Sequence, residues 1–119
     1  MSQKNLVIYH NARCSKSRET LQLIQSHDIE PEIIDYLDEP PDPAELKRII
    51  ALLGVEARDI MRTTEPVYRD AELDDDSLSE DDIIEAICEY PELLQRPIVI
   101  AGDRAIIGRP PSRVIELIG

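Results

Sequence analysis

The sequence has no long hydrophobic run. No stretch approaches the roughly eighteen consecutive apolar residues of a membrane-spanning helix, so we expect no membrane span. The first residues, MSQKNLVIYHNARC, turn polar before the apolar core of a secretory signal could form, so we expect no cleaved signal. With 119 residues and a hydrophobic fraction of 42%, the chain has the size and composition of one globular domain.

Cysteine is scarce, because Cys14 and Cys88 are the only two in the chain. In a protein that is not exported, two cysteines indicate reduced thiols in the cytoplasm and argue against a disulfide scaffold. Ser17 stands where a dithiol oxidoreductase has its second cysteine, so Cys14 has no local resolving partner, and Thr20 stands where a tyrosine-phosphatase loop has its arginine. The two cysteines and two histidines have no zinc-ligand spacing, so we expect no bound metal.

Positive charge is also scarce, and it is unevenly placed. Against 25 acidic residues the chain has 13 basic ones, and the net charge of −12 argues against nucleic acid or an anionic membrane as the main partner. Residues 1–18 carry +4 without any acid, residues 19–95 carry −18, and residues 96–119 carry +2. If the two ends meet in the fold, they form a local positive site that suits a small anion.

The spacing of apolar and turn residues predicts an α/β fold. A buried strand at residues 5–9, a helix at 15–26 and a second strand at 32–37 form a βαβ unit with parallel strands. An apolar hairpin at 98–107 and a last helix at 112–118 form a ββα unit. This order is typical of a thioredoxin-like domain, here interrupted by a helical insertion at about residues 42–92.

Within the insertion, local signals mark the ends of the helices. Asp42 and Gly54 bound one helix, a short helix is expected at 57–62, and Ser79 begins a helix that ends near Tyr90. Residues 70–82 have eight acidic side chains, so we expect an exposed loop there.

Cys14 lies at the junction of the first predicted strand and helix. Free backbone N–H groups and the helix dipole favour a thiolate there, and Arg13, Lys16 and Arg18 add positive charge. We therefore interpret Cys14 as a monothiol nucleophile beside an anion site, with the resolving thiol supplied from elsewhere. Cys88, on the face of a predicted helix, is interpreted as a core thiol.

Four segments together carry a family resemblance: IYHNARCSKSRETL, the arginine of IMR, LQRPIVI and IIGRP. In order and spacing they resemble the glutaredoxin-coupled arsenate reductase family, which has a thioredoxin-like fold with a helical insertion. The resemblance implies that Cys14 is the nucleophile and that Arg62, Arg96 and Arg109 bind the oxyanion. It also places His10 near the thiolate as a second catalytic residue, although His10 could equally be a strand-end residue bonded to backbone.

The resemblance implies an activity and its partners as well. The expected enzyme is a cytoplasmic arsenate reductase that uses glutathione as co-substrate and glutaredoxin as partner, with no bound cofactor. Pro97 matches the cis-proline that this fold places beside the active cysteine, and Ala12 departs from the proline that is usual in the family. Tetrahedral oxyanions suit the bidentate guanidinium groups of arginine.

Two alternatives stay open. The first is a glutathione-dependent thiol/disulfide reductase on the same scaffold, against which the three arginines argue because a neutral disulfide needs no anion clamp. The second is a non-enzymatic regulator that binds RNA polymerase. Such regulators commonly carry a C-x-x-C redox switch, and Ser17 removes it here.

Overall fold

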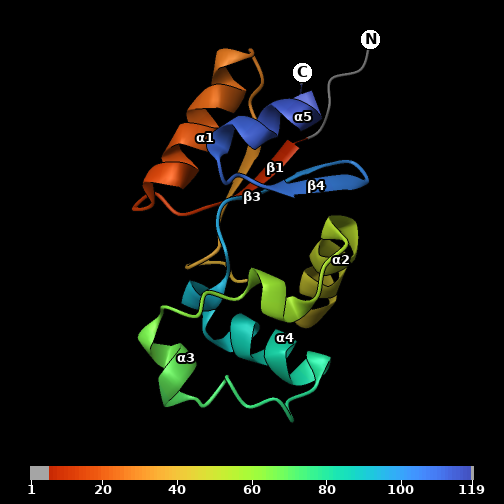
Figure 1. Ribbon diagram of the computed structural model, residues 1–119. Helices are drawn as coiled ribbons and strands as arrows, with labels where there is room; N and C mark the ends of the chain where they lie inside the picture. The colour runs from red at the N-terminus through yellow and green to blue at the C-terminus, as the bar shows by residue number, and fades with distance from the viewer. Residues whose placement is uncertain (1–5, 119) are drawn as a thin grey trace. The chain divides into compact units, whose positions relative to one another are not determined.

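The computed structural model of the chain describes residues 6–118 (Figure 1). It divides into two compact units, of which the first combines the chain up to Glu39 with the chain from Arg96 onward, and the second is Pro40–Gln95. The second unit has nearly the bounds of the predicted insertion, while the grouping of the whole chain into one domain stays a prediction. Within the described residues, no helix is long and apolar enough to cross a membrane.

The first unit is built on a four-stranded sheet with the strand order β2-β1-β3-β4. β1 pairs in parallel with β2 and antiparallel with β3, and β4 pairs antiparallel with β3. The elements are β1 (Leu6–His10), α1 (Ser15–Ser26), β2 (Glu32–Asp35), β3 (Ile98–Ala101), β4 (Arg104–Ile107), the 3-10 helix η3 (Pro111–Val114) and α5 (Ile115–Ile118). The predicted βαβ and ββα units and the α/β class are confirmed.

Some predicted bounds in this unit need correction. The second strand ends two residues earlier than predicted, at Asp35, where a turn begins. The last helix starts one residue earlier than predicted, as a 3-10 helix with Pro111 at its first position, and only its second half is an α-helix. Asn5, the predicted first residue of β1, lies outside the described residues.

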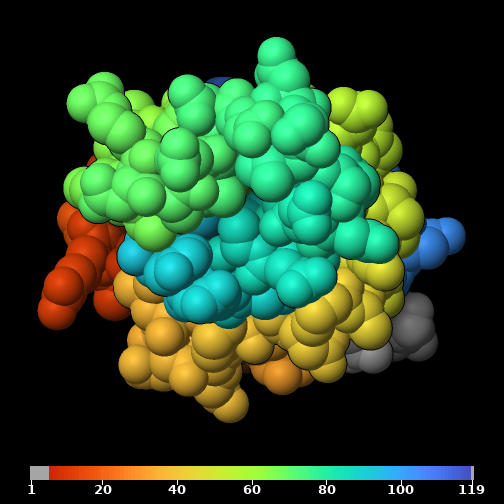
Figure 2. Space-filling view, turned by 90° about the horizontal axis from the view of Figure 1, so that it is seen from below, coloured from red at the N-terminus to blue at the C-terminus, as the bar shows by residue number. Residues whose placement is uncertain are grey.

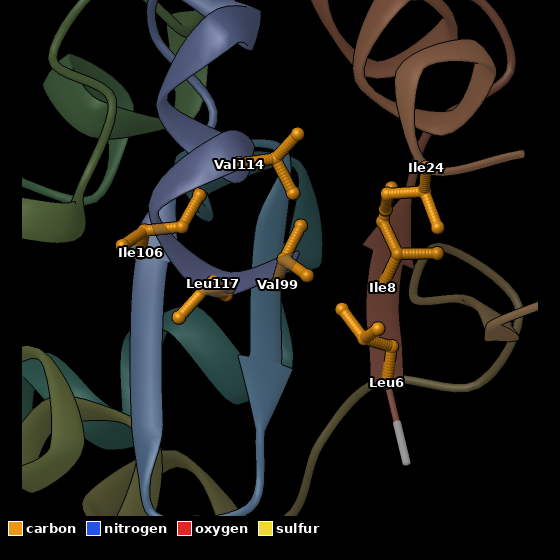
Figure 3. Close-up of a cluster of buried hydrophobic side chains, with 7 residues drawn as sticks. All are labelled: Leu6, Ile8, Ile24, Val99, Ile106, Val114 and Leu117. Carbon is orange, nitrogen blue, oxygen red and sulfur yellow. The ribbon is translucent and has the colours of Figure 1, made fainter. Parts of the chain in front are cut away.

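A cluster of buried aliphatic side chains packs α1, η3 and α5 against the sheet. Figure 3 shows these side chains directed toward one another: Leu6, Ile8, Ile24, Val99, Ile106, Val114 and Leu117. Full burial of one such side chain contributes about 1.5–3 kcal/mol to folding. The cluster therefore holds α1 in place next to β1, and the loop between these elements carries Cys14.

Gly108 marks a close approach of the chain after β4 to α1. Its N–H donates to the carbonyl of Pro97 at 2.9 Å. A Cβ atom at this position would lie 2.6 Å from Oγ1 of Thr20 and 2.8 Å from Cγ of Pro97. Glycine is needed here because any side chain would have to displace one of these neighbours. The approach also brings the following residue, Arg109, near the beginning of α1.

The second unit is helical. Its elements are α2 (Pro43–Leu53), the 3-10 helix η1 (Ala57–Ile60), α3 (Pro66–Asp70), α4 (Glu80–Glu89) and the 3-10 helix η2 (Pro91–Leu93). The side chain of Asp42 caps α2, Gly54 ends it with φ of 71°, and Ser79 forms a capping box with Asp82 at α4. These predicted helix ends are confirmed because each depends on residues only a few positions apart.

Three features of the second unit differ from the prediction. The short helix at 57–62 is a 3-10 helix that ends at Ile60, and the five-residue helix α3 was not predicted. Arg58 donates to the carbonyls of Leu73 and Asp75 at 2.8 and 2.7 Å, which ties down the acidic segment that Figure 2 shows in green at the surface. Cys88 is half-buried, so its interpretation as a core thiol is wrong.

Candidate active site

Cys14 is the N-cap residue of α1. Its backbone is extended, with φ of −95° and ψ of 122°, and its side chain is half-buried. The backbone N–H of Cys14 donates to the carbonyl of Asn11 at 3.0 Å, and its own carbonyl accepts from the N–H of Arg18 at 3.0 Å. The residue is thus fixed from both sides, and its sulfur lies at the positive end of the helix dipole.

The pKa of the Cys14 thiol is lowered below its ordinary value. Burial by itself raises the pKa, but the backbone N–H of Ser17, the Arg96 guanidinium and the backbone N–H of Lys16 together outweigh it. The charge that helps the thiolate is therefore that of Arg96, from the far end of the chain. The predicted help from backbone N–H groups at the helix start is confirmed, and the added charge predicted from the exposed side chains of Arg13, Lys16 and Arg18 stays a prediction.

Two arginines converge on Cys14 from the chain that flanks the β3–β4 hairpin. Nη2 of Arg109 lies 3.6 Å from Sγ of Cys14, although the residues are 95 positions apart. Nε of Arg109 donates to the carbonyl of Arg96 at 2.7 Å, so the two arginines are coupled. Each is followed by a cis proline, which for Pro97 agrees with the family resemblance. The fold thus brings together two of the three predicted oxyanion residues.

His10, at the end of β1, is buried beside this loop. Its Nδ1 lies 2.7 Å from Oγ of Ser17, which also accepts the backbone N–H of Asn11 at 3.0 Å. Burial lowers the pKa of His10, the charge of Arg18 lowers it further, and Asp35 on β2 opposes the shift. Since the ordinary value is 6.5, the ring is neutral at physiological pH. Its partner is a side chain, so the alternative of a bond to backbone does not describe it.

Arg62, the third predicted oxyanion residue, belongs to the second unit. Its Nε lies 3.3 Å from a carboxylate oxygen of Glu65, and its Nη1 donates to the side-chain oxygen of Gln95 at 3.2 Å. Its backbone N–H donates to the carbonyl of Leu93 at 2.7 Å. The guanidinium is therefore held in a defined orientation within its unit, and its part in oxyanion binding stays a prediction.

Sequence reasoning missed one residue of the site, Ser17. The side chain of Ser17 is fully buried and has two polar partners. The helical spacing predicts that Ser17 shares a face with Leu21 and Ile24, but this spacing does not indicate that its hydroxyl contacts His10. Among residues 6–118, no group of three or more His, Cys, Asp or Glu side chains is placed to hold a metal ion.

Comparisons with known proteins agree with this geometry. The sequence profile of the ArsC family matches residues 9–117, which is nearly the whole chain. The chain belongs to the ArsC family. It is 44% identical over 115 residues to a Haemophilus influenzae protein named arsenate reductase, covering 96% of this chain and 99% of that one. It is also 48% identical over 117 residues to the Escherichia coli K12 protein named Uncharacterized protein YfgD, covering 98% of each.

The fold of this ArsC-family chain is that of a solved relative. The structure titled "Arsenate reductase from Vibrio cholerae" has a TM-score of 0.94 to it at 45% sequence identity, covering 97% of this chain and 98% of that one. The predicted membership of an arsenate reductase family with a thioredoxin-like fold is thereby confirmed.

Proposed function

We propose that this ArsC-family protein reduces arsenate to arsenite, with the Cys14 thiolate as nucleophile. The observation that carries the proposal is the placement of the Cys14 sulfur at the start of α1 with the guanidinium groups of Arg96 and Arg109 beside it. The names of relatives at 44–46% identity support arsenate as the substrate.

An oxyanion suits this site better than a neutral disulfide does. Two guanidinium groups offer several N–H donors to a tetrahedral anion, and the N–H groups at the start of a helix add to the positive potential. Arg62, which the family resemblance names, is a third candidate donor in the proposal. A neutral disulfide would gain little from such groups, so the alternative of a thiol/disulfide reductase is disfavoured.

The first proposed step joins Cys14 to arsenic. The thiolate attacks pentavalent arsenate, an S–As bond forms, and one As–O bond breaks. The departing oxygen leaves as water after protonation, and no electrons change hands in this step. Arg96 and Arg109 would stabilise the negative charge on the remaining oxygens, and such stabilisation is commonly the largest contribution to catalysis of this kind.

The second proposed step is the reduction, and it needs glutathione as co-substrate. The glutathione thiolate attacks the Cys14 sulfur, an S–S bond forms, and the electron pair of the S–As bond stays on arsenic. Arsenic is thereby reduced by two electrons, while two thiols are oxidised to a mixed disulfide. A glutaredoxin thiol then attacks the glutathione sulfur and releases the Cys14 thiolate. The proposed cycle depends on reduced thiols, which the cytoplasm supplies. It requires no bound cofactor.

The proposal is tested by NADPH oxidation in a mixture of arsenate, glutathione, glutaredoxin and glutathione reductase. Cys14→Ser should abolish the activity, because a hydroxyl is not ionised at neutral pH and attacks poorly. Cys88→Ser is the matched control and should retain most of it, since burial raises the pKa of the Cys88 thiol and so disfavours its thiolate. Equal loss in both variants would contradict the monothiol mechanism, and a wild-type protein inactive with arsenate would contradict the substrate.

A further inference from the structure

Ser17 is a polar residue in an unusual place. It lies in the first turn of α1 with none of its surface exposed, three residues after Cys14. A buried hydroxyl without partners would cost about 1–3 kcal/mol, so its presence calls for a compensating role. Its oxygen lies 2.7 Å from Nδ1 of His10 and accepts the Asn11 N–H at 3.0 Å.

The tautomer of His10 decides the role of the Ser17 hydroxyl in this contact. The Asn11 N–H can only donate, so it occupies one lone pair of the Ser17 oxygen. The hydroxyl keeps its own proton and a second lone pair, so Nδ1 of a neutral His10 ring either accepts that proton or donates one. The first arrangement, with the ring proton on Nε2, gives the buried hydroxyl proton an acceptor at 2.7 Å.

Two successive hydrogen bonds connect the Ser17 hydroxyl to the backbone of Cys14. Asn11, whose N–H is held by Ser17, uses its carbonyl to accept the N–H of Cys14 at 3.0 Å. The side-chain oxygen of Asn11 accepts the N–H of Arg13 at 2.9 Å, which closes the turn. Ser17 also directs its own backbone N–H toward the sulfur. The loop before Cys14 and the first helical turn after it are thus joined at one residue.

We propose that Ser17 is a positioning residue for Cys14: its hydroxyl holds His10 in the Nε2–H tautomer and fixes residues 11–14, so that the sulfur stays aligned with the helix N–H groups. The charged groups that face the pair are Arg96 and Arg109 at Cys14, and Asp35 and Arg18 at His10. The proposal deepens the proposed function, since it concerns the same nucleophile. It does not depend on arsenate as the substrate.

The first test is the tautomer of His10 by ¹⁵N-detected NMR at neutral pH. The chain has two histidines, and His27 is an internal control. Nδ1 of His27 lies 2.9 Å from the carbonyl of Leu23, which can only accept, so Nδ1 of His27 carries its proton. We expect opposite patterns for the two rings, and Ser17→Ala should remove the fixed pattern of His10 alone. An Nδ1–H pattern for His10, or no change in Ser17→Ala, would overturn the proposal.

The second test is the alkylation of Cys14 by iodoacetamide as a function of pH. In Ser17→Ala the rate at neutral pH should fall roughly three- to tenfold, the equivalent of one lost hydrogen bond, and the midpoint should move upward. Thr20→Val is the matched control, because it deletes another buried hydroxyl of α1 that donates to the carbonyl of Lys16 and not to the loop. An equal loss in Thr20→Val would show that general destabilisation is the cause and would overturn the proposal.

A pair of His10 variants keeps the proposal testable if Ser17→Ala does not fold. Asparagine places its amide near the position of Nδ1, whereas glutamine places it near Nε2. If His10 acts through Ser17, His10→Asn should retain more Cys14 reactivity than His10→Gln. The reverse order would overturn the positioning role. None of these measurements uses arsenate, so a failure of the proposed function would leave them unaffected.

Discussion

Replacing Arg109 with lysine keeps a positive charge near Cys14 and removes the planar guanidinium. The change loses the Nε donor to the Arg96 carbonyl at 2.7 Å and the Nη2 contact to Sγ at 3.6 Å. One flexible ammonium group cannot make both contacts and also bind an oxyanion. A lost hydrogen bond to a charged group is worth about 1.5–3 kcal/mol, so kcat/KM for arsenate should fall roughly ten- to a hundredfold.

The coupled NADPH assay measures this loss, and two other arginines provide controls. Arg104 on β4 and Arg69 on α3 are both exposed, and lysine at either position should leave the activity near that of the wild type. Equal, small losses at Arg109, Arg104 and Arg69 would refute the reasoning, because the chain would then have no dedicated oxyanion site. The thiol/disulfide reductase would become the better description.

Alkylation of Cys14 separates the roles of the two arginines. Arg96 lowers the pKa of Cys14, so Arg96→Lys should alter the pH dependence of alkylation by iodoacetamide, a neutral reagent. Arg109→Lys should impair arsenate turnover much more than alkylation. An alkylation defect in Arg109→Lys as large as its turnover defect would show that Arg109 serves the thiolate and not the oxyanion.

Three further predictions follow from the same geometry. The pH midpoint of alkylation should lie below the ordinary value for a thiol at Cys14 and above it at Cys88, whose pKa is raised by burial. Peptide mass spectrometry would resolve the two thiols, and coincident midpoints would contradict both shifts. Gly108→Ala should destabilise the fold by about 1–3 kcal/mol through overpacking, seen in thermal melting, whereas Gly102→Ala, with φ of 62° and open space around it, should cost only about 1 kcal/mol. The pKa of His10 is lowered in the folded chain, so the stabilising effect of the neutral ring is present above pH ~6.5 and is lost as the pH falls through the lowered value. On acidification, the melting temperature of the wild type should therefore fall more steeply than that of His10→Asn.

The sequence predicted well those features that depend on neighbouring residues. The helix-end residues Asp42, Gly54 and Ser79 each act over a few positions, and the structure has them where they were expected. The short helix α3 was missed because its two charged residues, Arg69 and Asp70, continue into an acidic stretch that gives no amphipathic signal.

The sequence predicted the part of the site that a motif encodes and missed the part that depends only on packing. The convergence of Arg96 and Arg109 on Cys14 was expected from the family resemblance, since no local pattern connects residues 95 positions apart. The effect of Arg96 on the Cys14 thiolate likewise has no signal among the residues that neighbour Cys14 in the sequence. The contact between His10 and Ser17 depends on how the end of β1 meets the first turn of α1, and no periodicity encodes it.

The most direct test of the mechanism is to trap the mixed disulfide on Cys14. The wild-type protein is incubated with glutathione and arsenate without glutaredoxin, and its peptides are analysed by mass spectrometry. With arsenate as the oxidant, the peptide that contains Cys14 should gain the mass of one glutathione, and it should gain none when arsenate is omitted. A glutathione adduct on Cys88 alone, or one on Cys14 that forms equally without arsenate, would contradict the account.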